Sequence, residues 1–174
     1  MKLLLALALP IFALDQATKW WTVRHLALSR EWPPIDPEAH LAVWPGVFHL
    51  VYWANTGAAF SMGHGKNGWF IAVSLVALIG IVIATMRGVF PDRLSQIGVG
   101  LLVGGILGNL TDRILHGHVV DFLLVDLQVR FADPWPAFNV ADSAICCAVG
   151  TFILASFLAP KVEENSKFQE PNSK

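Results

Sequence analysis

Long uncharged stretches separated by short charged segments dominate the pattern of this chain. Three of them run from Asn67 to Met86, from Leu94 to Thr111 and from Ser143 to Pro160. A helix needs about 20 mainly apolar residues to cross a bilayer, with its backbone polar groups bonded inside the helix. Each stretch therefore predicts one membrane-spanning helix.

The amino-terminal segment predicts a further span that carries charge. Leu3 to Leu14 is uncharged. A helix long enough to cross the membrane continues to Trp20 and Trp21, a pair typical of a membrane interface. Such a helix carries Asp15 and Lys19 near its far end. The segment also resembles a secretory signal peptide, but the three later spans favour its retention as the first of four.

The longest connection, His25 to Lys66, follows the first span. Within it Val47 to Trp53 resembles a strand, so we expect a small interfacial layer that contains strands. We therefore predict a mainly α membrane protein with four transmembrane helices and a small extracytoplasmic strand-containing layer. Residues 1–160 form a single integral-membrane domain in this prediction, and residues 161–174 form a polar cytoplasmic tail.

Composition supports the membrane prediction and argues against nucleic acid as a partner. Hydrophobic residues make up 55% of the 174 residues and charged residues only 14%, and the mean hydropathy is +0.55. These values are too apolar for an ordinary soluble domain of this length. The formal net charge of −1 and the lack of a basic stripe give no signature of polyanion binding.

Lysine and arginine positions favour a bundle with both termini in the cytoplasm. The basic residues divide evenly between the two sides of such a bundle. The segments assigned to the inside are much shorter, so their density of positive charge is higher. The tight basic turn from Arg87 to Arg93 supports the same orientation.

Ionisable and amide side chains gather at one end of the predicted spans. Asn109, Asp112 and Arg113 close the third span, and Asn139 and Asp142 open the fourth. Helical spacing places Asn109 on the same side as Asp112 and Arg113. Because such groups are costly in a bilayer, they indicate a functional site in the interior of the bundle.

Asp121 and Asp142 predict a pair of cooperating carboxylates. Taken singly, Asp142 could cap a helix, and Asp112 could form an ion pair with its neighbour Arg113. Two acids near one interface, in a chain this poor in charge, favour a pair that shares a proton. The charged member can deprotonate water while its partner protonates or polarises a carbonyl. This is the chemistry of amide hydrolysis without metal or covalent intermediate.

Other catalytic arrangements have weaker support. His116 and His118 resemble a metal-binding pair, but no carboxylate or cysteine stands at a recognised ligand spacing. We therefore predict no metal and no cofactor. Four candidate nucleophiles either lack a base or lie inside a predicted span: Ser61, Ser143, Cys146 and Cys147.

Glycines in the third span predict close helix packing. Gly100, Gly104 and Gly108 form two overlapping patterns of small residues four apart. This spacing lets helix backbones approach closely in membranes. Close approach here would bring the Asn109 end of the helix against its neighbours.

Five blocks of sequence together resemble bacterial lipoprotein signal peptidase, also called signal peptidase II. They occur in the order typical of that family and cover most of the chain outside the first connection and the tail. The blocks are Asp15–Lys19, Asn55–Ser61, Gly104–Arg113, Val119–Phe122 and Phe138–Ser143. The stretch from Trp32 to His40 looks longer than is usual in the family, which leaves the gating of substrate in this connection open.

The resemblance implies a multi-pass protein of the bacterial inner membrane, with cytoplasmic termini and an extracytoplasmic active site. It implies removal of the signal peptide from diacylglyceryl-modified prolipoproteins, just before the lipidated cysteine, by the catalytic residues Asp121 and Asp142. The partners it implies are lipid-modified prolipoproteins and membrane lipids, and we expect the protein to function as a monomer. Substrate-binding positions are Asn55, Gly57, Asn109, Arg113 and Asn139, and supporting positions are Asp15, Lys19 and Asp112.

Two other classes of protein remain as alternatives from the residues alone. In a proton-coupled small membrane transporter, Asp112, Asp121 and Asp142 would relay protons, but such proteins commonly show repeated halves or acids near mid-span. No internal repeat is evident in the chain. An assembly subunit without catalysis would explain the glycine pattern but not the clustered acids.

Overall fold

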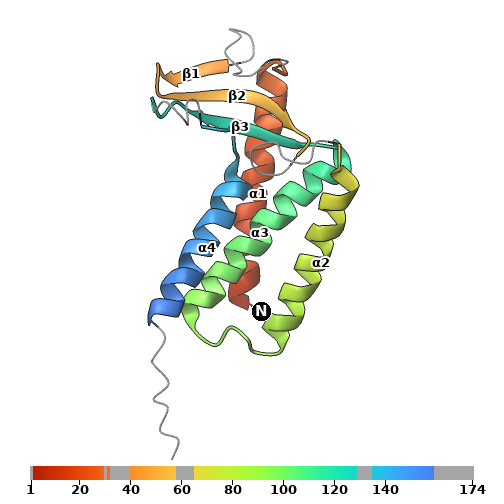
Figure 1. Ribbon diagram of the computed structural model, residues 1–174, viewed down its shortest axis with the longest axis vertical. Helices are drawn as coiled ribbons and strands as arrows, with labels where there is room; N and C mark the ends of the chain where they lie inside the picture. Colours follow the sequence, from red (N-terminus) through yellow and green to blue (C-terminus); the bar gives the residue numbers. More distant parts are fainter. Residues whose placement is uncertain (1, 30, 32–39, 58–64, 129–134, 159–174) are drawn as a thin grey trace, which may run out of the picture.

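The computed structural model describes residues 2–29, 31, 40–57, 65–128 and 135–158. Four long helices form a bundle, and a three-stranded sheet lies across one end of it, which we call the sheet end (Figure 1). The opposite end, which carries the connection between the second and third helices, is called the turn end. In chain order the elements are α1 (Lys2–His25), β1 (His40–Trp44), β2 (Phe48–Asn55), α2 (Asn67–Met86), α3 (Arg93–Leu115), β3 (Val119–Val125) and α4 (Val140–Leu158).

The four helices confirm the predicted spans and the mainly α class. Each is long and apolar enough to cross a membrane. Three of them continue beyond the uncharged stretches: α1 runs past Asp15 and Lys19, α3 runs past Asp112 and Arg113, and α4 begins before Asp142. Charge does not end these helices, because the charged groups find partners on neighbouring elements instead of meeting lipid.

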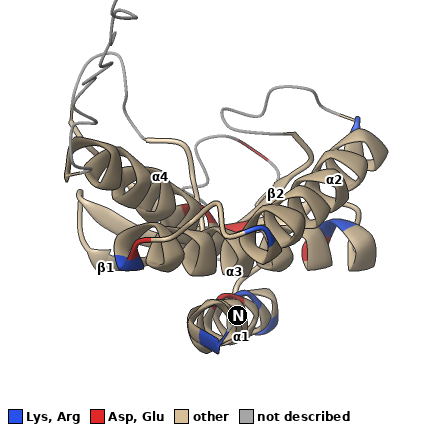
Figure 2. Ribbon diagram, turned by 90° about the horizontal axis from the view of Figure 1, so that it is seen from below, with Lys and Arg blue, Asp and Glu red and all other residues tan. Residues whose placement is uncertain are grey.

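The third helix is the centre of the bundle. Seen along the bundle, α1 lies on one side of α3, while α2 and α4 splay apart on the other (Figure 2). A Cβ atom added to Gly104 would lie 2.8 Å from the carbonyl oxygen of Ala8 in α1, and one added to Gly105 would lie 2.5 Å from that of Ala141 in α4. The glycines therefore let two neighbouring backbones approach α3, which confirms the packing predicted from their spacing.

The sheet is antiparallel, with strand order β1-β2-β3. Its middle strand, β2, contains most of the segment that was predicted as a strand. The third strand, β3, connects the third and fourth helices and was not predicted from the sequence. Val119 to Phe122 is buried without a break, so this segment lacks the alternation that marks a half-exposed strand.

An apolar core packs α1 against α3 toward the turn end of the bundle. Leu4 and Ala8 of α1 pack against Val99 and Val103 of α3. By contrast, α2 has no fully buried residue. The polar buried groups lie toward the other end of the bundle, where the helices meet the sheet. The predicted tail and most of the stretch from Trp32 to His40 lie outside the described residues.

Candidate active site

The chain brings Asp121 and Asp142 together by folding the start of α4 back onto β3. Asp121 is on β3, where it pairs in register with Trp53 of β2. Phe138, which precedes α4, forms an isolated bridge with Leu123 of β3. The Leu123 amide donates to the Phe138 carbonyl at 2.8 Å, and the Phe138 amide donates back at 3.0 Å. These bonds fix the first turn of α4 beside Asp121.

Asn139 links the two aspartates directly. Its side-chain Nδ2 donates to Oδ1 of Asp121 at 2.7 Å, and its Oδ1 accepts from the backbone amide of Asp142 at 2.9 Å. The Asp142 carboxylate in turn accepts from the Asn139 amide at 3.3 Å. The last two bonds form a reciprocal cap at the start of α4. Asp142 therefore caps its helix and also joins the acidic pair, so the two roles predicted for it are compatible.

Two hydrogen bonds and its position on α4 stabilise the charged form of the Asp142 carboxylate. Besides the Asn139 amide, it accepts from Asn109 Nδ2 at 2.8 Å. It lies in the first turn of α4, where the helix dipole stabilises negative charge. The amide of Asn109 is itself oriented, because its oxygen accepts from Lys19 Nζ at 2.9 Å.

Asp121 lies deeper than its partner and is only 1% exposed. Both of its oxygens are occupied, one by Asn139 and the other by Asn55 Nδ2 at 2.9 Å. Burial, followed by the negative charge of Asp142, raises the pKa of Asp121 to about 8. Hydrogen bonds from the two asparagines oppose this shift without cancelling it. At neutral pH the Asp121 carboxyl therefore holds a proton.

A buried cluster of charged side chains from α1 and α3 lies next to the two aspartates. Lys19 is 3% exposed, and its Nζ lies 2.8 Å from Asp15 and 2.9 Å from Asp112. Asp112 therefore pairs with Lys19 of α1, and the ion pair with Arg113 that the sequence suggested is not the one that forms. The physical reason is position: adjacent residues on a helix point in different directions, and α1 lies against α3.

The acids of this cluster also bond to the backbones that carry the aspartates. Asp15 accepts from the Ala141 amide at 2.9 Å, and Asp112 accepts from the Val120 amide at 3.0 Å. Val120 and Ala141 each directly precede one of the two aspartates. Asp15 and Asp112 thus help to fix the backbone positions of both aspartates.

Arg113 connects α3 to the segment that follows β2. Its Nη2 donates to the Gly57 carbonyl at 2.8 Å, and its guanidinium lies 5.0 Å from the centre of the Phe70 ring on α2. The Gly57 amide donates to Asn55 Oδ1 at 2.9 Å, and Asn55 bonds Asp121. A continuous chain of contacts therefore runs from Arg113 through Gly57 to Asp121.

The structure assigns Gln16 a contact that the site prediction omitted. Its Nε2 donates to Asp112 at 3.1 Å and to the Gly108 carbonyl at 3.2 Å. Gly108 lies close to Asp15, because a Cβ atom added there would overlap Asp15 Oδ2. Gln16 stands within the first of the five sequence blocks, and its position one residue after Asp15 was the available signal.

The weaker candidates lie outside this network. The rings of His116 and His118 are 6.1 Å apart, and the described residues contain no group of three or more His, Cys, Asp or Glu that could hold a metal ion. Burial, followed by the charge of His116, lowers the pKa of His118. The Ser143 hydroxyl donates to the Asn139 carbonyl within α4. Cys146 and Cys147 are exposed on α4, and Ser61 lies outside the described residues.

Comparison with known proteins points to one family. The family described as Signal peptidase (SPase) II matches residues 7–158. A lipoprotein signal peptidase from a Nostoc species is 39% identical over 149 residues, which cover 86% of this chain and 85% of that protein. One from Gloeobacter violaceus is 38% identical over 170 residues, which cover 94% of this chain and 90% of that protein.

Solved structures agree with the sequence comparison. A bacterial membrane enzyme superposes with a TM-score of 0.78 at 25% identity, over 100% of this chain and 96% of the other. A second structure with the same description superposes with a TM-score of 0.76 at 26% identity, over 92% of this chain and 96% of the other. The transporter alternative finds no support in these comparisons.

Proposed function

Because the chain belongs to the signal peptidase II family, we propose that it removes the signal peptide from diacylglyceryl-modified prolipoproteins, with Asp121 and Asp142 as its catalytic pair. The bond cut is the one just before the lipidated cysteine. The observation that carries the proposal is Asn139, whose side chain bonds Asp121 and the Asp142 backbone at once. This arrangement positions two carboxyl groups to act together as acid and base on one peptide bond.

The two aspartates take different roles. Asp142 is the base, since it sits at a helix start and accepts from Asn109, both of which favour its charged form. Asp121 is the acid, since burial raises its pKa and keeps it protonated at neutral pH. Their environments separate two chemically identical groups, as general acid–base catalysis requires.

The proposed reaction then follows in two steps. Asp142 takes a proton from water as the water oxygen attacks the peptide carbonyl carbon, and Asp121 gives its proton to the carbonyl oxygen. In the second step Asp142 passes the proton it gained to the amide nitrogen, and the carbon–nitrogen bond breaks. Asp121 recovers a proton from the hydroxyl as the new carboxyl group forms, so both aspartates return to their starting states.

Five neighbouring residues have binding roles in this proposal. Asn55, Asn109 and Asn139 orient the carboxylates, and the substrate backbone completes their hydrogen bonding when it enters. Arg113 carries five N–H donors, so its bond to Gly57 leaves capacity for a substrate carbonyl. In a water-poor cleft, such bonds offset the cost of burying peptide groups.

We propose that the sheet end faces the extracytoplasmic side of the bacterial inner membrane and that both termini are cytoplasmic. The basic turn at the other end supports this orientation, and Trp20 and Trp21 lie exposed near the sheet end of α1. Reporter fusions test it: a carboxy-terminal alkaline phosphatase should be inactive. An active fusion would show that the bundle is inverted or has an odd number of spans.

The direct test is incubation of the purified protein with a synthetic lipidated prolipoprotein peptide. We expect cleavage just before the lipidated cysteine, in the absence of any added partner, because one described chain holds the whole network. The same incubation with EDTA should proceed at the same rate. Loss of cleavage with EDTA and recovery with zinc would contradict the two-aspartate mechanism and favour a metal site at His116 and His118.

A further inference from the structure

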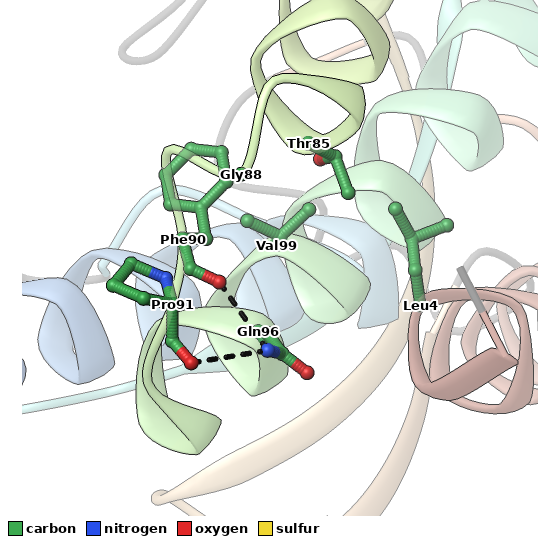
Figure 3. A pocket seen from close by; sticks show the side chains of 7 residues that line it. All are labelled: Leu4, Thr85, Gly88, Phe90, Pro91, Gln96 and Val99. Atoms are coloured by element: carbon green, nitrogen blue, oxygen red, sulfur yellow. Dashed lines mark hydrogen bonds between the residues drawn. The ribbon is translucent and has the colours of Figure 1, made fainter.

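A pocket of about 360 Å³ opens at the turn end of the bundle, far along α3 from the aspartates (Figure 3). Its walls come from three helices and the turn that joins two of them. They include Leu4 of α1, Thr85 of α2, Phe90 of the turn, and Gln96 and Val99 of α3. Within the described chain, no element fills the space between these walls.

The turn is held in the shape that forms the pocket. Gln96 Nε2 donates to the carbonyl oxygens of Phe90 and Pro91 at 3.3 and 3.4 Å, and Figure 3 shows its amide oxygen on the side away from these two bonds. Gly88 takes a positive φ of 72°, which suits the reversal of the chain after α2. The pocket is therefore built by specific contacts and is not a loose end between helices.

Exposed cations gather at the turn end of the bundle, where the pocket opens. The exposed cations described at this end are Lys2, Arg87 and Arg93, and the described carboxylate is Asp92. Asp92 caps α3, because its Oδ1 accepts from the Ser95 amide at 2.7 Å. Its charge therefore stabilises the start of α3, and the turn end of the bundle retains an excess of positive charge.

Two of the cations are close in sequence to residues that line the cavity. Arg93 and Gln96 are three apart on α3, so they lie on one side of that helix. Arg87 stands in the chain between Thr85 and Gly88, which both line the cavity. An anion bound by the arginines would therefore lie at the same end of the bundle as Leu4, Phe90 and Val99, the apolar side chains that line the cavity.

We propose that this pocket binds an anionic phospholipid of the surrounding bilayer, with part of one acyl chain inside and the phosphate group at Arg87 and Arg93. The four helices cross a membrane, so their ends lie at its surface and the medium around the pocket is lipid. A cavity between spanning helices that has apolar side chains in its walls and cations at the same end of the bundle fits an acyl chain joined to a negative head group. A second copy of this chain fits less well, because the equivalent basic ends of two bundles would repel each other.

Native mass spectrometry of the purified full-length protein tests the proposal. Dioleoylphosphatidylglycerol, which is anionic, and zwitterionic dioleoylphosphatidylcholine are added in separate samples before release from detergent. The wild type should retain one molecule of the anionic lipid and bind it at least about fivefold more tightly than the zwitterionic lipid. Equal retention of the two lipids, or retention of neither, would overturn the proposal.

Three variants locate the site. Arg87→Gln and Arg93→Gln should each weaken retention of the anionic lipid by on the order of fivefold, since each removes one charge near the head group. Thr85→Trp should abolish retention by filling the cavity. Lys66→Gln is the matched control, because it removes an exposed cation at the opposite end of α2 and should retain lipid as the wild type does.

Folding is checked separately from binding. Each variant is first shown to keep the wild-type thermal unfolding profile in lipid-free detergent. If Thr85→Trp does not fold, the two arginine variants decide, since both side chains are exposed and their replacement leaves the core untouched. Wild-type retention in both arginine variants, or equal weakening in Lys66→Gln, would show that the pocket is not the binding site.

Discussion

The second and third helices cross the same membrane but are built on opposite principles. α2 is the more apolar of the two, and none of its residues is fully buried. α3 is less apolar, yet it buries Asn109, Asp112 and glycines from Gly98 to Gly108. In a soluble protein the more apolar helix would be expected inside.

The difference shows what places a helix at the centre of a membrane bundle. Lipid tails are as apolar as leucine, so contact with lipid does not penalise the apolar surface of α2. Close backbone approach at glycines and hydrogen bonds between polar groups give α3 its central position instead. Small and polar residues thus mark the interior of this protein, and the site lies where α3 carries both.

The largest expected effect is at the site that α3 supports. Asp121→Asn and Asp142→Asn each keep the size of the side chain and remove its titratable group, so turnover should fall by about 10³- to 10⁴-fold. Both variants should still insert, fold and bind lipidated substrate, and the uncleaved precursor should accumulate in cells. Initial cleavage rates, normalised to folded protein, measure the effect.

Asp92→Asn is the matched control for that experiment. It makes the same chemical change at the opposite end of α3, and asparagine caps a helix as well as aspartate does. Near-normal turnover is expected from it. Turnover within tenfold of the wild type in either Asp121→Asn or Asp142→Asn would refute the assignment of the pair.

The next largest effect is expected on stability, at the ion cluster between α1 and α3. Asp112→Asn removes one of the two carboxylates that pair with the buried Lys19. Loss of one partner of a buried pair typically costs about 3–5 kcal/mol, and because Asp15 remains we expect about 2–3 kcal/mol. Thermal unfolding in detergent should show this loss, whereas turnover per folded molecule should change much less. A variant with wild-type stability and lost turnover would instead give Asp112 a direct catalytic role.

A glycine on each helix sharpens the comparison between α2 and α3. Gly104→Ala places a methyl group 2.8 Å from the Ala8 carbonyl oxygen, whereas one on Gly80 of α2 meets nothing within 4 Å. Overpacking at Gly104 should cost about 1–3 kcal/mol. Gly80→Ala should be neutral or slightly stabilising, because alanine favours a helix. Equal unfolding temperatures for the two variants would show that α1 and α3 are not held by close packing.

The smallest effect is expected from pH. Since the pKa of Asp121 is raised to about 8, turnover should fall about tenfold between pH 7 and pH 9 as this acid loses its proton. The same shift favours the folded state most below the unfolded pKa of 3.8, and this contribution is lost as pH rises through the folded pKa near 8. Gly80→Ala should show the same alkaline fall in turnover. A profile that stays flat to pH 10 would argue against Asp121 as the acid.

Sequence reasoning picked out most members of the buried polar network but not their partners in it. Asp15, Asn109 and Asp112 stood out because polar residues are rare in membrane-spanning segments. This property can be recognised at each position without knowledge of the rest of the fold. The partner of Asp112 could not be read in this way. The sequence suggested its neighbour Arg113, whereas the structure pairs it with Lys19, which lies far away along the chain.

The sequence alone determined the four spans, the close-packing role of the glycines and the identity of most polar residues at the site. These depend on local properties: the length of an apolar stretch and the cost of charge in lipid. The tertiary structure alone decided that β3 joins the sheet and that Asn139 links Asp121 to α4. It also placed Asp15 against the backbone of Ala141. Such contacts depend on which distant segments meet in the folded chain, as α1 and α4 do at the glycines of α3.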